Sequence, residues 1–591
     1  MTDEEPEPIS AALLAEVRAW IAADPDPSTR EELEELISNG DGAGVRSRFE
    51  SPLSFGTAGL RGALGAGPAR MNRLVVRKTT AGVARWLLDQ GPGAAERGIV
   101  VGRDARNGST EFAGDVADVA LAAGVRVRVL PRPLPTPITA FAVKHFGAAA
   151  GVMITASHNP AADNGYKVYA GDGAQIIPPD DARIAEAAAK ALPSSSAPVG
   201  EPFGTAEVID ETELIAAYRR AAFAFLDPAG PRELRIVYTP MHGVGAAVLP
   251  ELLDEAGFGP VSIVAAQAEP DPEFPTVAFP NPEEPGALDL AFFDAARLGA
   301  DIILANDPDA DRLAVAVQDP DTRAWRRLTG DELGALLADH LLATTQGDDR
   351  LVATTIVSST MLSKMAAAAG VVCVETLTGF KWIARAALRR PGTRLIFGYE
   401  EALGYEVGDI VSDKDGLSAA LVAAEIAAIA KAQGSSLLGR LDAIASRFGV
   451  HATSQWSLRL SGSDAQAEMA NIVSHWRAEP PEALGRIAVI EVVDLAVADS
   501  ELPATDALVF RLAGGARVVL RPSGTEPKLK AYLEVVGKPA PKEQLDEERR
   551  RASGQLRAIE GDVAARCQSI SASPPNKRRA TGTTSGASES S

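Results

Sequence analysis

The sequence predicts an α/β protein with a smaller α+β region at its C-terminal end. Short apolar segments alternate with amphipathic helical segments in three successive stretches of the chain, a pattern typical of mixed or parallel sheets covered by helices. The chain has 591 residues, which corresponds to roughly four domains at about 150 residues each. Beyond residue 451 the strand-like segments follow one another with little helix between the last three, which indicates a domain of a different kind.

The individual elements are predicted from hydrophobic spacing. The first fifty residues are expected to be helical, because Leu13, Val17 and Trp20 recur at helical spacing, and Ser28 and Glu31 have capping-box spacing ahead of a second helix. The strands expected in the three α/β stretches are residues 98–102, 125–130, 149–155, 234–239, 261–265, 301–305, 351–355, 371–374 and 395–397, with a helix near 109–123. Those expected in the last domain are 455–460, 486–493, 508–512, 516–520 and 529–536, before a charged helix after residue 542.

These segments divide the chain into six parts. We expect an N-terminal helical extension, three α/β domains, an α+β domain and a tail, with the boundaries 1–50, 51–225, 226–332, 333–450, 451–569 and 570–591. The tail is rich in Ser, Thr, Pro and Gly and is expected to be disordered. Its short basic cluster, residues 577–579, is explained more simply as a solvated charge run than as a binding site.

Composition excludes several classes of protein. No uninterrupted apolar run reaches about 18 residues, which argues against a transmembrane helix. The acidic N-terminus lacks an apolar core, which argues against a secretory signal, and two cysteines in 591 residues exclude a disulfide scaffold. We therefore expect a cytoplasmic protein that does not bind a membrane. The formal charge of −21 argues against extended nucleic-acid binding and, at first sight, against a phosphorylated ligand.

The most informative segment runs from Gly151 to Pro160 (GVMITASHNP). An apolar strand ends at Thr155, and the turn after it presents Ser157 where a sheet exposes ligands. A serine beside His158 is a candidate activated nucleophile. The alternative is a polar turn in which Asn-Pro simply ends the strand.

Asn306 to Arg312 (NDPDADR) follows another predicted strand. Asp307, Asp309 and Asp311 occupy alternate positions, which on an extended loop can point three hard oxygen ligands at one Mg²⁺. Three close carboxylates would otherwise repel each other, so a cation or a basic partner is expected. The alternative is an exposed acidic turn.

Four further segments are weaker when each is considered alone. Arg521 to Lys528 (RPSGTEPK) lies between two strands and could wrap a phosphate with its side chains and backbone N–H groups. Phe397 to Gly404 (FGYEEALG) places adjacent acids on a loop, where they could bind sugar hydroxyls. Thr378 to Lys381 (TGFK) resembles a helix start with a cation, and Gly56 to Gly62 (GTAGLRG) is one of many glycine-rich loops.

Taken together and in this order, the segments make the chain resemble the α-D-phosphohexomutase superfamily of phosphoglucomutases and phosphomannomutases. The resemblance covers about residues 50 to 540 and rests on TASHNP, DPDADR, GYEEALG and RPSGTEPK, with GRDAR (102–106) and LPTP (134–137) in addition. Residues 377–381, residues 399–404 and the N-terminal extension look most like the phosphoglucomutase-2 and phosphopentomutase branch. The resemblance implies four domains around one central cleft.

The resemblance also implies roles for individual residues. Ser157 would carry the catalytic phosphoryl group and give Mg²⁺ one oxygen, and Asp307, Asp309 and Asp311 would be the other metal ligands. Arg61, His158 and Lys167 would surround the reacting phosphate, with His158 or Lys167 as general acid and base. The residues that would bind the substrate are Thr57, Thr378, Gly379, Lys381, Glu400, Arg521, Ser523, Gly524, Thr525 and Lys528.

The implied reaction interconverts glucose 1-phosphate and glucose 6-phosphate through a phosphoserine enzyme and a sugar 1,6-bisphosphate. One Mg²⁺ per chain and a bisphosphate activator are expected, with a phosphorylated monosaccharide as partner and a monomer or weak homodimer as the assembly. Ala402 departs from the serine of many glucose- and mannose-specific members and removes a possible contact to a sugar hydroxyl. Mannose and pentose phosphates therefore remain alternatives, as does synthesis of glucose 1,6-bisphosphate. A non-catalytic sensor is disfavoured, because Ser157 and all three aspartates are present.

Overall fold

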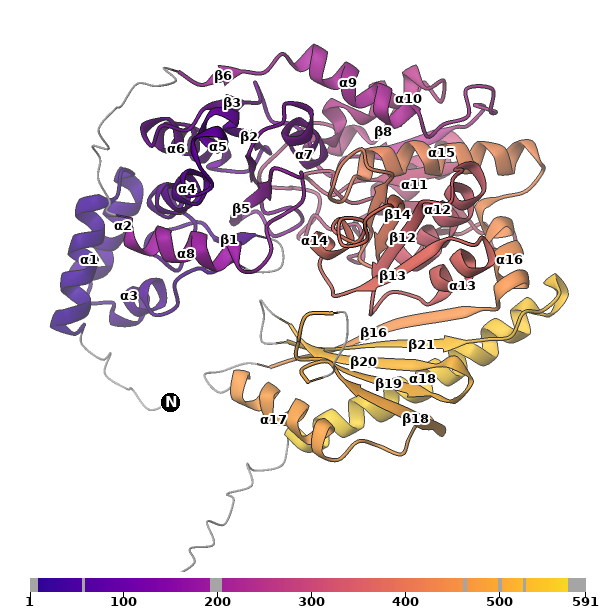
Figure 1. The fold of residues 1–591 in the computed structure, drawn as a ribbon. Coiled ribbons are helices and arrows are strands. Elements are labelled where there is room, and N and C mark those ends of the chain that lie inside the picture. The colour runs from indigo at the N-terminus through magenta and orange to yellow at the C-terminus, as the bar shows by residue number, and fades with distance from the viewer. Residues whose placement is uncertain are drawn as a thin grey trace, which may run out of the picture. The chain divides into compact units, whose positions relative to one another are not determined.

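The computed structural model describes residues 9–55, 59–191, 205–460, 465–497, 502–523 and 528–571. The chain forms two compact units, and each is described by itself. Unit 1 comprises residues 1–448 with 539–542, and unit 2 comprises residues 449–538 with 543–591. Four separate sheets, three in unit 1 and one in unit 2, confirm the predicted succession of three α/β domains and a different C-terminal domain (Figure 1).

Unit 1 begins with three helices, as its apolar spacing predicts. They are α1 (Ala11–Ala23), α2 (Pro27–Ser38) and α3 (Gly42–Phe49). The capping-box prediction at Ser28 is wrong, because α2 begins at Pro27 and Asp26 caps it by accepting from the Ser28 amide. Proline is well suited to the first helical position, where its missing N–H costs nothing.

The first sheet carries mixed strands in the order β1-β5-β4-β2-β3-β6. Strands β4, β2, β3 and β6 run parallel, whereas β5 lies antiparallel between β4 and β1. The strands are β1 (Leu60–Ala63), β2 (Ile99–Arg103), β3 (Val127–Val129), β4 (Ala150–Ile154), β5 (Asp163–Ala170) and β6 (Glu207–Val208). The helices of this part are α4 (Arg73–Leu88), α5 (Pro92–Arg97), α6 (Ser109–Ala122), α7 (Thr136–His145), α8 (Asp180–Lys190) and α9 (Glu211–Phe223).

The second sheet has the order β11-β10-β9-β7-β8; β9, β7 and β8 are parallel, and β10 pairs antiparallel with both β9 and β11. Its strands are β7 (Ile236–Thr239), β8 (Ser262–Ile263), β9 (Ile302–Ala305), β10 (Ala314–Gln318) and β11 (Trp325–Arg327). The accompanying helices are η1 (Val244–Ala247), α10 (Leu249–Glu255), η2 (Ala265–Gln267) and α11 (Asp289–Leu298).

The third sheet has the order β13-β12-β14-β15, and only its last pair is antiparallel. Its strands are β12 (Arg350–Thr355), β13 (Val372–Thr376), β14 (Arg394–Glu400) and β15 (Gly404–Val407). Its helices are α12 (Gly330–Thr344), α13 (Met361–Ala368), α14 (Phe380–Ile383), α15 (Gly416–Ala432) and α16 (Leu437–Phe448).

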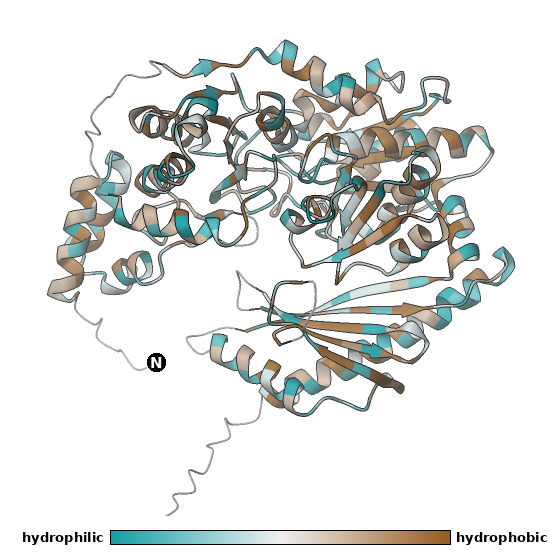
Figure 2. Cartoon of the chain, viewed as in Figure 1, coloured by the Kyte–Doolittle hydropathy of each residue, from teal (hydrophilic) through white to brown (hydrophobic). Residues whose placement is uncertain are grey.

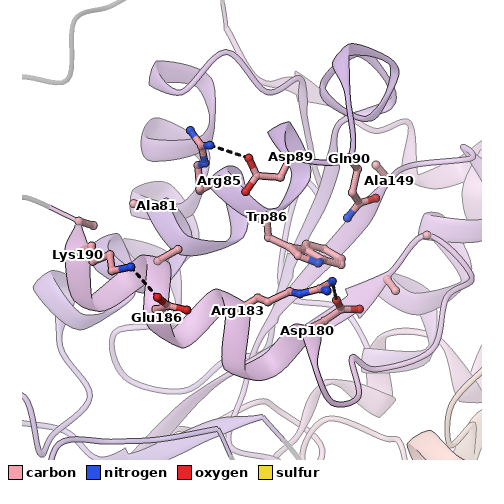
Figure 3. Close-up of a pocket in the computed structure, with 14 residues that line it drawn as sticks. Ala81, Arg85, Trp86, Asp89, Gln90, Ala149, Asp180, Arg183, Glu186 and Lys190 are labelled. Atoms are coloured by element: carbon pink, nitrogen blue, oxygen red, sulfur yellow. Dashed lines mark hydrogen bonds and ion pairs between the residues drawn. The ribbon is translucent and has the colours of Figure 1, made fainter.

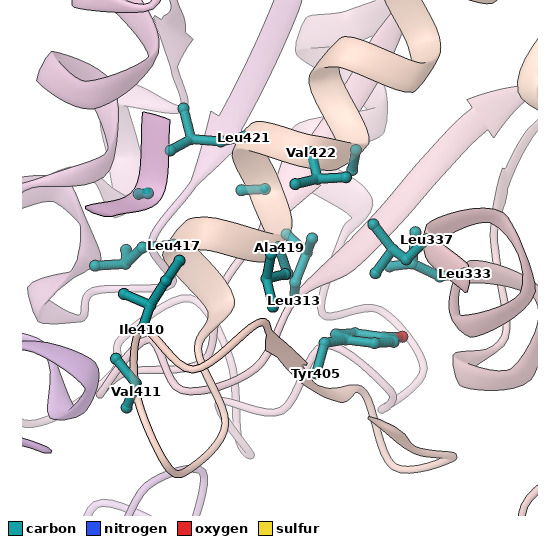
Figure 4. Close-up of a cluster of buried hydrophobic side chains, with 14 of the residues drawn as sticks. Leu313, Leu333, Leu337, Tyr405, Ile410, Val411, Leu417, Ala419, Leu421 and Val422 are labelled. Carbon is teal, nitrogen blue, oxygen red and sulfur yellow. The ribbon is translucent and has the colours of Figure 1, made fainter. Parts of the chain in front are cut away.

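Helix α15 lies in the largest hydrophobic core of unit 1. It is rich in Ala and Leu on all sides, as a fully buried helix must be, and Asp415 caps it by accepting from the amides of Leu417 and Ser418. Figure 4 shows its side chains beside Leu313 and beside Tyr405 of β15. This core therefore holds the chain that follows β9 in a fixed place.

In the described part of the chain, no single helix is long and apolar enough to cross a membrane. Helices α15 and α16 reach the required length and apolar character only as a pair, and the two are bent by 90° at the break between them.

Unit 2 is an antiparallel sheet with helices, in the strand order β16-β21-β20-β19-β18-β17. Its strands are β16 (His451–Arg459), β17 (Ala483–Leu484), β18 (Ile487–Asp494), β19 (Leu508–Leu512), β20 (Arg517–Pro522) and β21 (Lys528–Val536). The helical segments are α17 (Ala465–Ala478), η3 (Ala513–Gly515), η4 (Lys542–Gln544) and α18 (Leu545–Ser571). Hydrophobic residues are frequent on β19 and β18, whereas α18 mixes both kinds (Figure 2). Most of the predicted tail, 572–591, lies outside the described residues.

Candidate active site

Ser157 lies in the turn that directly follows strand β4. Its hydroxyl donates to Oδ2 of Asp307 at 2.7 Å and lies 3.2 Å from Nδ1 of His158. Its amide donates to the Thr155 hydroxyl at 2.8 Å, and its φ of 55° is in the left-handed region that non-glycine residues rarely adopt. The buried side chain is thus brought from the first sheet onto the loop that follows β9 of the second.

The three aspartates form one buried cluster, with carboxylate oxygens all within 4.8 Å of one another. The loop that carries them is a tight turn and not the extended segment that we expected. The Ala310 amide donates to the Asp307 carbonyl at 2.8 Å, and Ala310 has a φ of 55°. The predicted convergence is confirmed, but the backbone turn produces it, and not the alternation of side chains along an extended chain.

This cluster has the donors that a divalent cation needs. Oδ1 of Asp309 and Oδ1 of Asp311 are buried and have no hydrogen-bond partner among the described residues. Buried carboxylate oxygens without partners are costly, and hard oxygen donors suit Mg²⁺. The residues present therefore fit a metal ion, with the Ser157 hydroxyl next to them.

Two lysines neutralise the same cluster. Nζ of Lys167 lies 2.7 Å from Oδ2 of Asp309 and 2.8 Å from Oδ2 of Asp311, and Nζ of Lys414 lies 3.3 Å from Oδ2 of Asp311. Burial alone would lower the pKa of Lys167, but Asp309 and Asp311 outweigh it and raise that pKa. Burial alone would raise the pKa of Asp311, but Lys167 and Lys414 outweigh it and hold that pKa far below its usual value. Both lysines are therefore charged at neutral pH.

Asp307 has a different environment from the other two aspartates. Its Oδ1 accepts from the Arg312 amide at 3.0 Å. Burial, followed by Asp311 and Asp309, raises the pKa of Asp307 well above its usual value. Burial, followed by Arg312 and Arg61, lowers the pKa of the neighbouring His158 well below its usual value. An uncharged imidazole therefore lies beside Ser157 at neutral pH.

Arg61 and Arg312 add further positive charge. Nη1 of Arg61 donates to Oδ1 of Asn159 at 3.4 Å, in the turn that carries Ser157. Nη1 of Arg312 donates to the Ala402 carbonyl at 2.9 Å, and its guanidinium lies 3.8 Å from the Glu283 carboxylate. Arg312 thus connects the aspartate loop to the segment that was predicted to bind sugar.

That segment is the turn of a hairpin and not a free loop. Glu400 ends β14, Leu403 has a φ of 62°, and the Leu313 amide donates to the Leu403 carbonyl at 3.1 Å. Burial raises the pKa of Glu400 against the opposing effects of Lys414 and Arg312. The structure therefore brings Glu400 beside the cations of the aspartate cluster.

Thr378, Gly379 and Lys381 lie at the junction of β13 and α14. Gly379 has a φ of 106°, which favours glycine at this position. Lys381 is buried and lines a small pocket with Gly59, Gln175 and Asp181, and burial lowers its pKa. The structure thus places Lys381 against the first α/β domain and not on the aspartate cluster.

The predicted phosphate-binding segment lies in unit 2. Arg521 is in β20, Lys528 begins β21, and the Ser523 amide donates to the Lys528 carbonyl at 2.7 Å across the connection. Gly524 and Thr525 lie outside the described residues, as does Thr57 in unit 1.

Sequence reasoning missed three residues of this site. Lys414, Arg312 and Thr136 all touch the aspartate loop, and the Thr136 hydroxyl donates to Oδ2 of Asp309 at 2.6 Å. Arg312 and Thr136 belong to the quoted motifs DPDADR and LPTP but received no role. Lys414 stands in Asp413-Lys414-Asp415-Gly416, where a lysine between two acids just before a buried helix was the available signal.

A cavity of about 1020 Å³ opens elsewhere, between α4 and α8 (Figure 3). Its cations are paired with acids of their own helices, namely Arg85 with Asp89, Arg183 with Asp180 and Lys190 with Glu186. Because these ion pairs neutralise the cations that line the cavity, little net positive charge remains to bind a phosphorylated ligand. The aspartate cluster is therefore the better candidate for the active site.

Comparison with known proteins identifies the family to which the chain belongs. The models for phosphoglucomutase/phosphomannomutase match in order, with the α/β/α domains I, II and III at residues 52–194, 216–320 and 329–445 and the C-terminal domain at residues 478–552. A probable phosphomannomutase from Haemophilus influenzae is 41% identical over 79% of this chain and 93% of its own length. The phosphopentomutase of Mus musculus is 36% identical over 91% of this chain and 94% of its own length.

The fold is likewise shared with solved structures. A phosphoglucomutase/phosphomannomutase family protein from Burkholderia thailandensis matches 85% of this chain and 97% of its own, with a TM-score of 0.62 and 20% identity. The family models match all four predicted domains, and the relatives include a phosphopentomutase. The chain therefore belongs to the phosphoglucomutase/phosphomannomutase family of the α-D-phosphohexomutase superfamily, isomerases that transfer a phosphoryl group within a phosphosugar.

Proposed function

We propose that this chain interconverts glucose 1-phosphate and glucose 6-phosphate through a phosphorylated Ser157 and a sugar 1,6-bisphosphate. The observation that carries the proposal is the hydrogen bond of 2.7 Å from the Ser157 hydroxyl to Asp307, inside a cluster of three carboxylates. A serine held on a cation site is positioned to exchange a phosphoryl group whose charge needs neutralising. Ser157, Asp307, Asp309 and Asp311 would hold Mg²⁺, which when bound supplies charge stabilisation for the phosphoryl oxygens.

The first half of the reaction moves one phosphoryl group and one proton. The bond between Ser157 Oγ and phosphorus breaks, a bond from phosphorus to a sugar hydroxyl oxygen forms, and the hydroxyl proton ends on Oγ. His158 supports this exchange because its imidazole is uncharged and lies 3.2 Å from Oγ, so that it can take up one proton and return another. The second half reverses these changes with the other phosphate of the bisphosphate.

Lys167 is better placed to stabilise charge than to move a proton. Asp309 and Asp311 hold it protonated, and its ammonium group donates to both of their carboxylates. Arg61 and Arg312 add two half-buried guanidinium groups, the first bonded to Asn159 of the turn and the second to the Ala402 carbonyl. We assign all three side chains to stabilising the transferring phosphoryl group.

Binding of the sugar is assigned to Glu400, Thr378 and Gly379, together with Lys381. The support is strongest for Glu400, whose neighbours Lys414 and Arg312 also touch the aspartate loop. The phosphate that does not react is assigned to Arg521, Ser523 and Lys528, with the adjoining Gly524 and Thr525. Their support is the sequence of the connection between β20 and β21, in which hydroxyl, glycine and basic residues of the kind that bind phosphate follow one another.

Pentose phosphate is the second candidate substrate, and two observations favour it. Ala402 offers only a methyl group where a serine could bond a hexose hydroxyl. In addition, a phosphopentomutase matches this chain along nearly its whole length. Mannose phosphate and the synthesis of glucose 1,6-bisphosphate from a separate phosphoryl donor complete the set of activities to be compared.

The test measures catalytic efficiency on glucose, mannose and ribose 1-phosphates with Mg²⁺ and catalytic glucose 1,6-bisphosphate. Ser157→Ala should lower kcat by more than about 1,000-fold, because an essential covalent carrier is lost. Ser418→Ala, which alters an equally buried serine in α15, is the matched control. Intact mass should show one phosphoryl group on the wild type and none on Ser157→Ala. A loss below about tenfold would refute the carrier role.

A further inference from the structure

The guanidinium of Arg106 binds the backbone of the turn that carries Ser157. Nη2 donates to the carbonyls of Ser157 at 2.7 Å and Asn159 at 2.6 Å, and Nη1 donates to those of Pro160 at 2.8 Å and Asp163 at 3.1 Å. One buried side chain therefore satisfies four carbonyl groups of a segment that starts at the proposed nucleophile. Arg106 is the last residue of the GRDAR motif, for which no role has been assigned above.

Arg106 is itself fixed on two sides. Its Nε lies 3.4 Å from Oδ2 of Asp104, whose Oδ1 accepts from the Arg106 amide at 3.0 Å and from the Ser109 hydroxyl at 2.7 Å. The ring of Phe274, in the segment between η2 and α11, lies 4.9 Å from the guanidinium. Only 4% of Arg106 is exposed. The guanidinium is thus held in one orientation by the first α/β domain and by a residue of the second.

The turn needs such support because its conformation is unfavourable. A non-glycine residue with a positive φ, as at Ser157, persists only where the surroundings impose it. Without Arg106 the carbonyls of Ser157 and Asn159 would lose these hydrogen bonds in a largely buried place, whereas the carbonyl of Pro160 also accepts from the Asp163 amide at 3.0 Å. Arginine offers five donors in a planar fork, whereas lysine offers three from a single point and cannot reach four diverging carbonyls equally.

We propose that Arg106 is the positioning residue that holds the turn 157–163 in the shape that directs Ser157 Oγ onto Asp307. It contacts neither the sugar nor the reacting atoms and acts through the backbone. The proposal rests on the role of Ser157 proposed above. Phe274 makes the same guanidinium a link between the domain that carries Ser157 and the domain that carries the aspartates.

The test compares Arg106→Lys with a matched control in the same sheet. Arg128 lies in β3, is 9% exposed, donates to one carbonyl, that of Arg97, at 3.0 Å, and lies 5.6 Å from the ring of Phe146. Arg128→Lys removes a similar buried guanidinium far from the turn. Arg106→Lys should lower kcat by about 100-fold, because small misplacements of a reacting group have effects of that size. KM should change no more than in Arg128→Lys, and Arg106→Lys should keep a cooperative melting transition, although its melting temperature should fall further because more hydrogen bonds are lost.

Hydrogen exchange gives a second readout that does not depend on activity. Amides of residues 157–163 should exchange faster in Arg106→Lys than in wild type, and those of β3 should not. Guanidinium ion added to Arg106→Ala should restore part of kcat, whereas it should not improve Ser157→Ala. If Arg106→Ala does not fold, the kcat and the hydrogen exchange of Arg106→Lys test the proposal on their own.

The outcomes separate this proposal from the proposed function. A wild type without mutase activity would refute the function, yet the exchange experiment would still test Arg106. An active wild type whose Arg106→Lys variant keeps both its kcat and its exchange pattern would overturn the role of Arg106. So would an equal loss of kcat in Arg128→Lys, since the effect would then be general to buried arginines of this sheet.

Discussion

At the scale of single residues, the aspartate cluster owes its properties to side chains that arrive from other parts of the chain. The spacing of Asp307, Asp309 and Asp311 was sufficient to predict that they converge. Spacing could not reveal that Lys167 and Lys414 bond two of them, because these lysines come from β5 and from the segment before α15. Charge in a buried site is therefore set by the packing of elements that are distant in sequence.

Ala402 allows a direct test of sugar preference. Ala402→Ser should raise kcat/KM for glucose 1-phosphate relative to ribose 1-phosphate by about 2- to 10-fold, since one hydrogen bond is worth about 0.5–1.5 kcal/mol. The carbonyl of residue 402 already accepts from Arg312, so the backbone there is fixed. The measurement is the ratio of the two efficiencies in variant and wild type. An unchanged ratio would show that residue 402 does not contact the discriminating hydroxyl.

The raised pKa of the Glu401 carboxyl leads us to expect that the stability of the fold depends on pH. Burial, followed by Glu400 and Asp331, raises the pKa of Glu401 from 4.5 to about 7 in the folded chain. The folded state therefore binds this proton more tightly than the unfolded chain, and the free energy of unfolding falls as pH rises from about 4.5 towards 7. Glu401→Gln removes this contribution. Between about pH 5 and pH 7.5 the variant should lose less unfolding free energy than the wild type.

Urea denaturation at both pH values measures this difference, with the exposed Glu34→Gln as control. Glu34→Gln should follow the wild type at both pH values. Wild-type and Glu401→Gln curves that fall in parallel would show that Glu401 titrates normally in the folded chain.

At the scale of elements, the predictions succeeded where a strand is buried on both faces. β2, β4, β9 and β12 are continuous apolar runs, and each was predicted within about two residues of its observed bounds, which is typical of boundary uncertainty. β5 was missed because it mixes Asp163 and Lys167 with apolar residues. Lys167 is stabilised by aspartates of the second α/β domain and Asp163 by Asn159 of the neighbouring turn, contacts that hydrophobic periodicity cannot indicate.

The start of α2 shows the same limit at a helix terminus. Ser28 and Glu31 have the right spacing for a capping box, but Asp26 precedes Pro27 and satisfies the first turn instead. The hairpin at residues 400–404 was expected to be a loop because its glycine and acidic residues are common in loops. Glu400 of β14 pairs with Gly404 of β15, and the local sequence alone does not predict that these two strands pair.

One contact between elements allows a quantitative prediction of the free energy of unfolding. The Tyr169 hydroxyl, at the end of β5, donates to Oδ2 of Asp413 at 3.0 Å, next to Lys414. Tyr169→Phe should lower the free energy of unfolding by about 1.5–3 kcal/mol, because a bond to a charged acceptor is lost in a buried place. Tyr238→Phe is the matched control, since the Tyr238 hydroxyl donates to the neutral Asn306 amide oxygen at 2.9 Å and is equally buried.

The control Tyr238→Phe should lower the free energy of unfolding by about 0.5–1.5 kcal/mol. Chemical denaturation followed by fluorescence measures both variants. Equal losses, or a larger loss for Tyr238→Phe, would contradict the assignment of charge to the Asp413 contact.

At the scale of the whole molecule, a net charge of −21 coexists with a cluster of buried cations in unit 1. Lys167, Lys414, Arg61 and Arg312 are all buried or half-buried around the aspartate loop. The global charge therefore describes the outer surface and does not exclude a phosphorylated ligand. Chain length could predict the number of domains, and composition could give the net charge, but neither could show how charge is distributed among the domains.

This arrangement predicts that removing metal stops the reaction without unfolding the protein. Lys167 and Lys414 already compensate two aspartates, so the folded state does not depend on a divalent ion to offset their repulsion. Treatment with EDTA should abolish activity and lower the melting temperature by only a few degrees, in contrast to small domains that unfold without their metal. Calorimetry with and without Mg²⁺ measures this. A collapse of the transition in EDTA would contradict it.

The hydrogen bond from the Leu313 amide to the Leu403 carbonyl joins the end of the aspartate loop to the turn after Glu400. We expect this contact to couple movement of the hairpin to movement of the aspartate loop, so that a ligand bound at one affects binding at the other. Thermodynamic linkage then requires reciprocity, whatever the size of the effect. The factor by which a phosphosugar strengthens the binding of magnesium must equal the factor by which magnesium strengthens the binding of the phosphosugar.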